Sequence, residues 1–189
     1  MSGASEKTKN EILILVDMQV DFVSGKLGSK MAMDIVPNVC KKLEAYKQKS
    51  AFIIATLDTH DQNYLNTLEG KYLPVEHCIK GSEGHKIDEA LSKLLPSTTV
   101  YVEKNAFGSL NLIDVVKKYL VENNIDEHNL KIEAVGLCTD ICVVSNAILL
   151  RSAFPNSKIL VDSSCCAGTT KEKHLATLEV LKSCQIDVA

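Results

Sequence analysis

The amino-acid sequence predicts an α/β fold with three layers, α/β/α, around a mostly parallel sheet of six strands. Short apolar runs of strand length alternate with segments in which apolar residues recur at helical spacing. The first run, residues 12–16, is continuously apolar, which is typical of a strand buried on both faces. No linker, repeat or low-complexity segment breaks the alternation, so residues 11–189 are expected to form one domain.

The first elements after residues 12–16 follow from apolar spacing. Residues 34–49 have one apolar face and carry Pro37 near their start, where proline is tolerated, so they predict a helix. Residues 51–57 form a second apolar run and predict the next strand. Residues 58–85 are polar and without a clear period, and loops of this length in compact domains are usually functional.

The second half of the chain repeats the alternation. Residues 112–120 have apolar residues at helical spacing, and Ser109 is a candidate cap for that helix. A strand is expected at 98–103, where β-branched and aromatic residues concentrate. The remaining predicted strands cover residues 131–135, 158–161 and 185–188, and the remaining predicted helices cover residues 87–95, 140–153 and 171–183.

Composition and charge exclude several classes of function. The chain of 189 residues has a formal net charge of -3, and its lysines are interspersed with acids, so no basic stripe indicates nucleic-acid binding. No apolar run approaches the roughly 18 residues of a membrane span. Residues 1–10 are polar and are expected to form a flexible tail rather than a signal peptide. The 7 cysteines, an odd number, indicate reduced thiols in the cytoplasm.

Ionisable and nucleophilic side chains follow the predicted strands at their carboxyl ends. They are Asp17, Asp58 with His60, Lys104, the segment 136–142 with Cys142, and Asp162. Ligands of open parallel sheets bind beyond the carboxyl ends of the strands, so a functional site is expected at this edge.

Asp17, Lys104 and Cys142 have the chemistry of a nucleophilic site. A thiol attacks a carbonyl as the thiolate, which requires a base or a cation nearby. Cys142 is expected to open a helix, whose N-terminus would lower the pKa of the thiol. Asp17 could accept the thiol proton, and Lys104 could stabilise a developing oxyanion. The alternative is a buried cysteine beside an Asp17–Lys104 ion pair.

Asp58, His60, Glu69 and His77 are candidate metal ligands. Residues two apart in an extended segment point the same way, so Asp58 and His60 can face one ion. Two imidazoles and a carboxylate suit zinc, iron or manganese. The alternative is that His60 caps a turn and His77 is an exposed loop residue.

Residues 136–142 predict a strand, a tight turn led by Gly136, and then a helix. Such a turn presents free backbone N–H groups, which could form an oxyanion hole. The alternative is an ordinary turn capped by Thr139 or Asp140. The spacing of Cys138 and Cys142 is not Cys-x-x-Cys, so it does not indicate a metal or redox pair.

Three segments resemble the motifs of the isochorismatase-like cysteine hydrolases. They are Val16-Asp-Met-Gln-Val-Asp-Phe22, then Lys104 with Ala106, Phe107, Ser109 and Leu112, and finally Gly136-Leu-Cys-Thr-Asp-Ile-Cys-Val143. The segments occur in the order and on the elements that the family pattern requires. The resemblance covers roughly residues 11–188 and implies the isochorismatase-like hydrolase fold.

The resemblance implies roles for individual residues. Asp17 would be the general base toward Cys142, and Lys104 would be the cation between them. The backbone amides of Cys138 and Cys142 would form the oxyanion hole. A cis peptide bond is expected between Leu137 and Cys138.

Within this family, Asp58, His60 and His77 resemble the metal ligands of the nicotinamidases, with Glu69 as a further candidate ligand. The resemblance implies one divalent ion that binds the ring nitrogen of the substrate, with zinc favoured over iron or manganese. The side chains expected to contact the substrate are Phe22, Phe107, Leu137 and Tyr72.

The implied activity is hydrolysis of nicotinamide, and of pyrazinamide as a surrogate, to the acid and ammonia through a Cys142 thioester. One alternative is a related cysteine hydrolase acting on a carbamoyl or ureido amide. Another is a non-catalytic, ligand-binding member of the fold. The expected partner is a small-molecule amide, with no nucleic acid or membrane, and the family resemblance implies a homo-oligomer.

Overall fold

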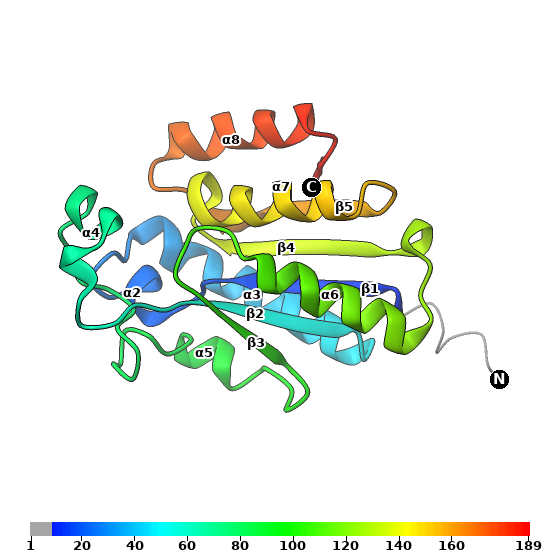
Figure 1. Cartoon of the computed structure of the whole chain (residues 1–189), viewed down its shortest axis with the longest axis horizontal. Coiled ribbons are helices and arrows are strands. Elements are labelled where there is room, and N and C mark those ends of the chain that lie inside the picture. Colours follow the sequence, from blue (N-terminus) through cyan, green and yellow to red (C-terminus); the bar gives the residue numbers. More distant parts are fainter. Residues whose placement is uncertain (1–8) are drawn as a thin grey trace.

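The computed structural model describes residues 9–189, in which helices cover both faces of a six-stranded sheet (Figure 1). Every neighbouring pair of strands is parallel, and the strand order is β3-β2-β1-β4-β5-β6. The predicted α/β/α class is confirmed, with a sheet that is parallel throughout. Of the tail predicted at residues 1–10, residues 1–8 lie outside the described part of the chain.

The strands match the predicted number, and all except β5 begin and end within two residues of the predicted positions. They are β1 (Glu11–Val16), β2 (Phe52–Asp58), β3 (Val100–Lys104), β4 (Lys131–Leu137), β5 (Lys158–Ala167) and β6 (Asp187–Val188). The prediction for β5 was wrong at its end, because the strand continues six residues past Val161. Asp162 therefore lies within β5 and not at the carboxyl edge, where the sequence had placed it.

The helices follow the predicted order with shifted boundaries. They are α2 (Val20–Val23), α3 (Lys30–Gln48), α4 (Leu68–Tyr72), α5 (Glu89–Ser92), α6 (Leu110–Asn123), α7 (Val144–Ala153) and α8 (Lys171–Ser183), with short turns η1 (Tyr64–Asn66), η2 (Glu127–Asn129) and η3 (Thr139–Val143). In residues 9–189, no helix combines the length and the hydropathy that a membrane crossing requires.

Two helix starts are set by serine caps. Ser109 accepts a hydrogen bond from the Leu112 N–H at 3.2 Å, so the cap predicted for α6 is present. Ser29 caps α3 in the same way, by accepting from the Ala32 N–H at 3.0 Å. α3 therefore starts four residues before the predicted position, and Pro37 lies inside the helix rather than near its start.

The sheet separates two apolar cores. The alternate residues Ile12 and Ile14 of β1 face one core, and Leu13 and Leu15 face the other. Helices α6, α7 and α8 cover the first face, and α3 and α5 cover the second. With β1 apolar on both sides and in the middle of the sheet, the chain that follows its carboxyl end is held in a fixed place.

A buried ionic network lies between α3 and the sheet. Lys42 Nζ is 2.5 Å from Glu133 Oε1 and 2.8 Å from Asp162 Oδ2. Tyr46 donates a hydrogen bond of 2.7 Å to the other oxygen of Glu133. Asp162 also accepts from the N–H and the hydroxyl of Ser164. The two carboxylates Glu133 and Asp162 thus have their charged and hydrogen-bonding partners on α3 and on β5 itself.

Replacing Asp162 with asparagine is expected to lower the free energy of unfolding by roughly 1–2 kcal/mol at pH 7. Burial would raise the pKa of Asp162, but hydrogen bonds from Lys42 and Ser164 outweigh it and hold the pKa below its ordinary value. A lowered folded-state pKa stabilises the protein above the unfolded pKa, and this stabilisation is lost as the pH falls. Urea unfolding of both proteins should therefore show the difference shrinking between pH 7 and pH 3. A difference independent of pH would contradict this role of Asp162.

Candidate active site

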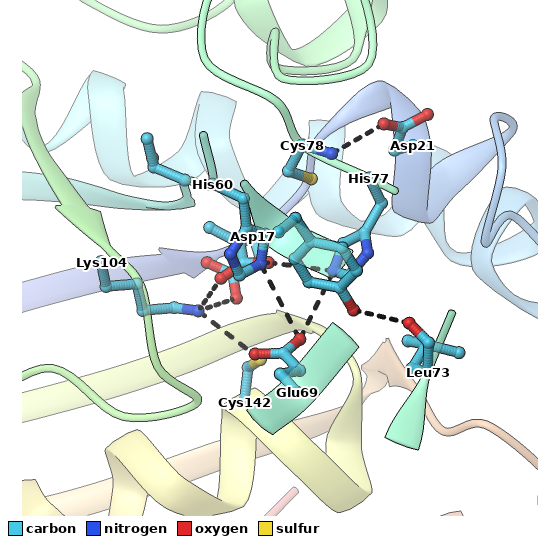
Figure 2. Close-up of polar contacts among 12 residues, drawn as sticks. Asp17, Asp21, His60, Glu69, Leu73, His77, Cys78, Lys104 and Cys142 are labelled. Atoms are coloured by element: carbon cyan, nitrogen blue, oxygen red, sulfur yellow. Dashed lines mark hydrogen bonds and ion pairs between the residues drawn. The ribbon is translucent and has the colours of Figure 1, made fainter. Parts of the chain in front are cut away.

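The candidate site lies at the carboxyl edge of the sheet, between β1 and β4. The strand order reverses at this point, so the loops that follow the two strands diverge and leave a crevice. Asp17 directly follows β1, and Cys142 lies in η3, directly after β4. Lys104 is the last residue of β3, and its side chain crosses the end of β2 to reach both (Figure 2).

The three residues predicted to act on a carbonyl are brought together. Lys104 Nζ lies 2.7 Å from Asp17 Oδ2 and 3.6 Å from Cys142 Sγ. All three are buried, with Asp17 completely so. A buried ammonium between a carboxylate and a thiol can stabilise negative charge on either group, which a general base and a nucleophile require.

Asp17 is held in an uncommon conformation. Its φ of 47° is in the left-handed region, which residues other than glycine rarely adopt. The Thr56 hydroxyl donates to Asp17 Oδ1 at 2.6 Å, and the Asp17 N–H donates back to that hydroxyl at 3.2 Å. Among the described residues, Oδ2 accepts no hydrogen bond of good direction, although Lys104 is near. Oδ2 therefore has the Lys104 ammonium as its nearby charge, while Oδ1 is held by Thr56.

Burial dominates the protonation of the resting site. It raises the pKa of the Cys142 thiol well above its ordinary value, and the negative charge of Asp17 adds to this shift while Lys104 opposes it. Burial also raises the pKa of Asp17. The net shift of the thiol pKa is therefore upward, so a lowering by the N-terminus of the turn, expected from the sequence, does not outweigh burial. A raised pKa favours the thiol over the thiolate, so forming the thiolate requires proton transfer within the site.

The turn that carries Cys142 is π-helical rather than the start of an α-helix. The helix predicted from residue 140 begins as η3, and α7 starts only at Val144. The peptide bond between Leu137 and Cys138 is cis, as the resemblance implies. Before it, Gly136 has φ of 127°, and a Cβ there would lie 2.1 Å from the Val16 carbonyl oxygen. Only glycine lets β4 pass this close to the end of β1.

Side chains that the sequence analysis missed hold this turn. Asn146 is fully buried and donates to the Cys142 carbonyl at 2.8 Å, while its own oxygen accepts from the Ser109 N–H. The Thr139 hydroxyl lies 2.8 Å from His174 Nδ1, and Asp140 accepts from the hydroxyl and N–H of Thr169. The alternative in which Thr139 or Asp140 caps an ordinary turn is therefore wrong, because both side chains instead contact α8 and the turn before it.

A four-donor cluster adjoins the nucleophile. The ligand atoms of Asp58, His60, Glu69 and His77 all lie within 4.8 Å of one another. Asp58 Oδ2 is 2.9 Å from His60 Nε2 and 3.3 Å from His77 Nε2, and Glu69 Oε1 is 3.8 Å and 3.6 Å from the same atoms. The alternative that His77 is an exposed loop residue is wrong, because it is 1% exposed.

The cluster fits one divalent metal ion. Zinc bonds of about 2.0–2.1 Å in tetrahedral geometry separate the donor atoms by roughly 3.4 Å, close to the spacing here. His77 Nδ1 lies 2.8 Å from the Val75 carbonyl, which orients the ring and leaves Nε2 for a metal. Burial alone would raise the pKa of Asp58, but hydrogen bonds from His60 and His77 hold it below its ordinary value. Lys104 Nζ, 3.3 Å from Asp58 Oδ1, links the cluster to Asp17 and Cys142.

A cavity of about 400 Å³ joins the two groups of residues. Its walls include Phe22, Phe107 and Leu137, three of the four side chains predicted to contact the substrate. Tyr72, the fourth, does not line this cavity; it is 84% exposed and borders a wider neighbouring groove. Leu73, the residue after the end of α4, lines the cavity instead.

Comparison with known proteins identifies the family. The family model of the isochorismatase domain matches residues 11–189. The chain belongs to the isochorismatase family. An uncharacterized isochorismatase family protein of Bacillus subtilis, PncA, is 29% identical over 86% of this chain and 88% of that protein. A nicotinamidase of Acinetobacter baylyi is 24% identical over 84% of this chain and 82% of its own length.

Solved structures of the isochorismatase family share the fold. The nicotinamidase PncA from Bacillus subtilis superimposes with a TM-score of 0.81 at 25% identity, over 95% of this chain and 99% of that chain. The pyrazinamidase of Pyrococcus horikoshii in complex with zinc gives a TM-score of 0.79 at 25% identity, over 95% and 98% of the two chains. These relatives support the assignment of this chain as a hydrolase of the isochorismatase family.

Membership of the isochorismatase family does not by itself establish activity. A probable inactive nicotinamidase of Arabidopsis thaliana is 26% identical over 95% of this chain and 91% of that protein. The chemistry must therefore be argued from the side chains present. In this chain Asp17, Lys104 and Cys142 share one buried site with four candidate metal donors.

Proposed function

We propose that this isochorismatase-family hydrolase is a metal-assisted amidohydrolase that converts nicotinamide, and pyrazinamide, to the acid and ammonia. The observation that carries the proposal is that one cavity wall contains both Cys142 and the donors Asp58, Glu69 and His77. A small aromatic amide could thus place its carboxamide at the thiol and its ring toward the metal cluster. The Bacillus subtilis and Pyrococcus horikoshii relatives support this substrate class.

Acylation would begin with the Cys142 thiol. Its proton passes to Asp17 Oδ2 as Sγ attacks the carboxamide carbon, and the carbonyl π-electrons move to oxygen. The backbone N–H groups of Cys138 and Cys142 would hold this oxyanion. Asp17 then gives its proton to the leaving nitrogen, the C–N bond breaks, and ammonia departs. The product left on Cys142 is a thioester.

Deacylation would reverse these roles. Asp17 takes a proton from water as the water oxygen attacks the thioester carbonyl, and the acid leaves as the Cys142 thiol is restored. Throughout both steps the Lys104 ammonium keeps a compensating charge beside Asp17 and Cys142. Its pKa is raised by these neighbours despite burial, so it stays protonated.

Asp58, His60, Glu69 and His77 would hold the ion, with zinc favoured and iron or manganese as alternatives. When bound, it would supply a Lewis-acid position for the ring nitrogen of the substrate. The side chains Phe22, Phe107 and Leu137 would pack on the ring and exclude water. The free state of all seven cysteines supports a cytoplasmic location, and a homo-oligomer stays a prediction.

Removing the metal with a chelator is expected to lower ammonia release from nicotinamide by at least roughly 100-fold, because three buried donors and the partly buried Glu69 would lose their ion. Adding zinc should restore the rate and raise the melting temperature by mass action. Ammonia release and metal content should be measured on the same samples. Full activity in metal-free protein would contradict the metal part of the proposal. A metal-loaded protein that does not hydrolyse nicotinamide but does hydrolyse ureido or carbamoyl amides would instead assign the substrate to that class.

A further inference from the structure

We propose that Gln19 and Asp21 are positioning residues that hold the four-donor cluster in shape. Both follow Asp17 in the same short segment, yet neither lines the cavity nor touches Cys142. The proposal rests on the proposed function in that the cluster is taken as the metal site. It assigns a purpose to two buried polar side chains that the proposed chemistry leaves unused.

Gln19 binds both sides of one ligand's backbone. Its side-chain oxygen accepts from the Asp58 N–H at 2.7 Å, and its side-chain nitrogen donates to the Asp58 carbonyl at 2.9 Å. The same nitrogen donates to the His85 carbonyl at 2.9 Å, so the amide makes three hydrogen bonds while fully buried. A side chain that satisfies both backbone groups of Asp58 fixes the position and direction of that residue.

Asp21 holds the turn that follows His77. Its Oδ2 accepts from the Cys78 N–H at 2.8 Å (Figure 2). Its Oδ1 accepts from the Lys26 N–H at 3.2 Å. A Cβ on Gly84 would lie 2.0 Å from Oδ2, so only glycine leaves room for this carboxylate. Cys78 has φ of 46°, an uncommon conformation for a residue other than glycine. The hydrogen bond to Asp21 holds that conformation directly beside the ligand.

The ligand segments are also joined to each other. The His60 N–H donates to the Cys78 carbonyl at 3.1 Å, and the Lys80 N–H donates to the His60 carbonyl at 2.8 Å. A displacement of the backbone in either segment would therefore also shift the other segment. Gln19 holds one segment and Asp21 holds the other, so together they set how far apart Asp58 and His77 lie.

This geometry explains why the contacts are more than general packing. Metal affinity depends on donor positions within tenths of an ångström, and loss of an outer hydrogen bond typically costs about 10–100-fold in affinity. Loss of these hydrogen bonds should therefore lower the affinity for the metal ion and not only the free energy of unfolding.

The test compares Gln19→Met and Asp21→Asn with the parent. Gln19→Met keeps the side-chain length but removes three hydrogen bonds, and it is expected to weaken Co²⁺ binding by roughly 10–100-fold. Asp21→Asn keeps the shape but turns one amide N–H₂ toward backbone donors, with a several-fold smaller effect. The visible absorption bands of the bound Co²⁺ should shift in both variants. The matched controls are Gln48→Met and Asp114→Asn, which are exposed on α3 and α6.

Affinities within about twofold of the parent and unchanged Co²⁺ bands in a folded Gln19→Met protein would overturn the proposal. If Gln19→Met does not fold, Asp21→Asn decides by the same readout. A parent that binds no Co²⁺ counts against the metal part of the proposed function instead. In that case, hydrogen exchange of the Asp58 and Cys78 amides tests whether Gln19 and Asp21 hold these two segments in place. Faster exchange in the variants supports it, and unchanged exchange contradicts it.

Discussion

Replacing Cys142 with alanine is expected to lower nicotinamide hydrolysis by on the order of 10⁴-fold or more, since Cys142 is the cavity thiol that lies beside Lys104 and would form the acyl intermediate. The variant should still fold, because the substitution removes one small side chain. Ammonia release under metal-replete conditions measures the first effect, and urea unfolding measures the second. The thioester should be detectable by mass spectrometry after rapid acid quenching of the parent and absent from the variant.

Cys184→Ala is the matched control for this experiment. Cys184 is a free, partly buried cysteine that follows α8 and does not line the cavity. It should keep the parent's rate and still form the thioester. Retention of more than about one hundredth of the parent's rate by Cys142→Ala would contradict the role of that thiol as nucleophile.

Replacing Lys104 with methionine is expected both to abolish turnover and to lower the free energy of unfolding by roughly 3–5 kcal/mol. The ammonium lies near Asp17, Asp58 and Cys142, so its removal leaves two buried carboxylates without their cation. Without Lys104 the folded-state pKa values of these carboxyls should rise. A raised carboxyl pKa favours the protonated folded state, so the loss of stability should grow from pH 4 to pH 7.

Lys117→Met is the control for Lys104→Met, because Lys117 is exposed on α6. Its effect on stability should stay within about 0.5 kcal/mol. Urea unfolding of both variants at several pH values checks the magnitude and its sign. Equal, small effects of the two substitutions would show that the buried ion pairs contribute little.

The sequence predicted the nucleophilic group because parallel strands fix where their ends meet. Asp17, Lys104 and Cys142 follow three different apolar runs, and such runs can only place these residues at one edge of a parallel sheet. Asp58 and His60 were predictable in the same way, as neighbours on one side of an extended segment. In each case the buried strand decides the place of the polar residue.

Other features depended on contacts that no local pattern contains. Glu69 reaches the cluster from α4, a five-residue helix inside a segment without a regular period. The extent of β5 was hidden by Asp162 and Ser164, polar residues whose partners in the folded chain include Lys42 and each other. The raised pKa of Cys142 depends on how deeply the turn is buried, which the sequence does not record.

The place of β1 in the sheet has a consequence for how the molecule is made. β1 is translated before the other five strands described here, yet it lies inside the sheet, paired with β2 on one side and with β4 on the other. On a growing chain, β2 emerges soon after β1, but the other edge of β1 stays open until residues 131–137 have been translated. Such long-range parallel pairing is slow to form. While residues 59–130 are translated, the backbone N–H and C=O groups on that edge of β1 therefore have no strand partner, and the crevice between β1 and β4 can form only after β4 has emerged.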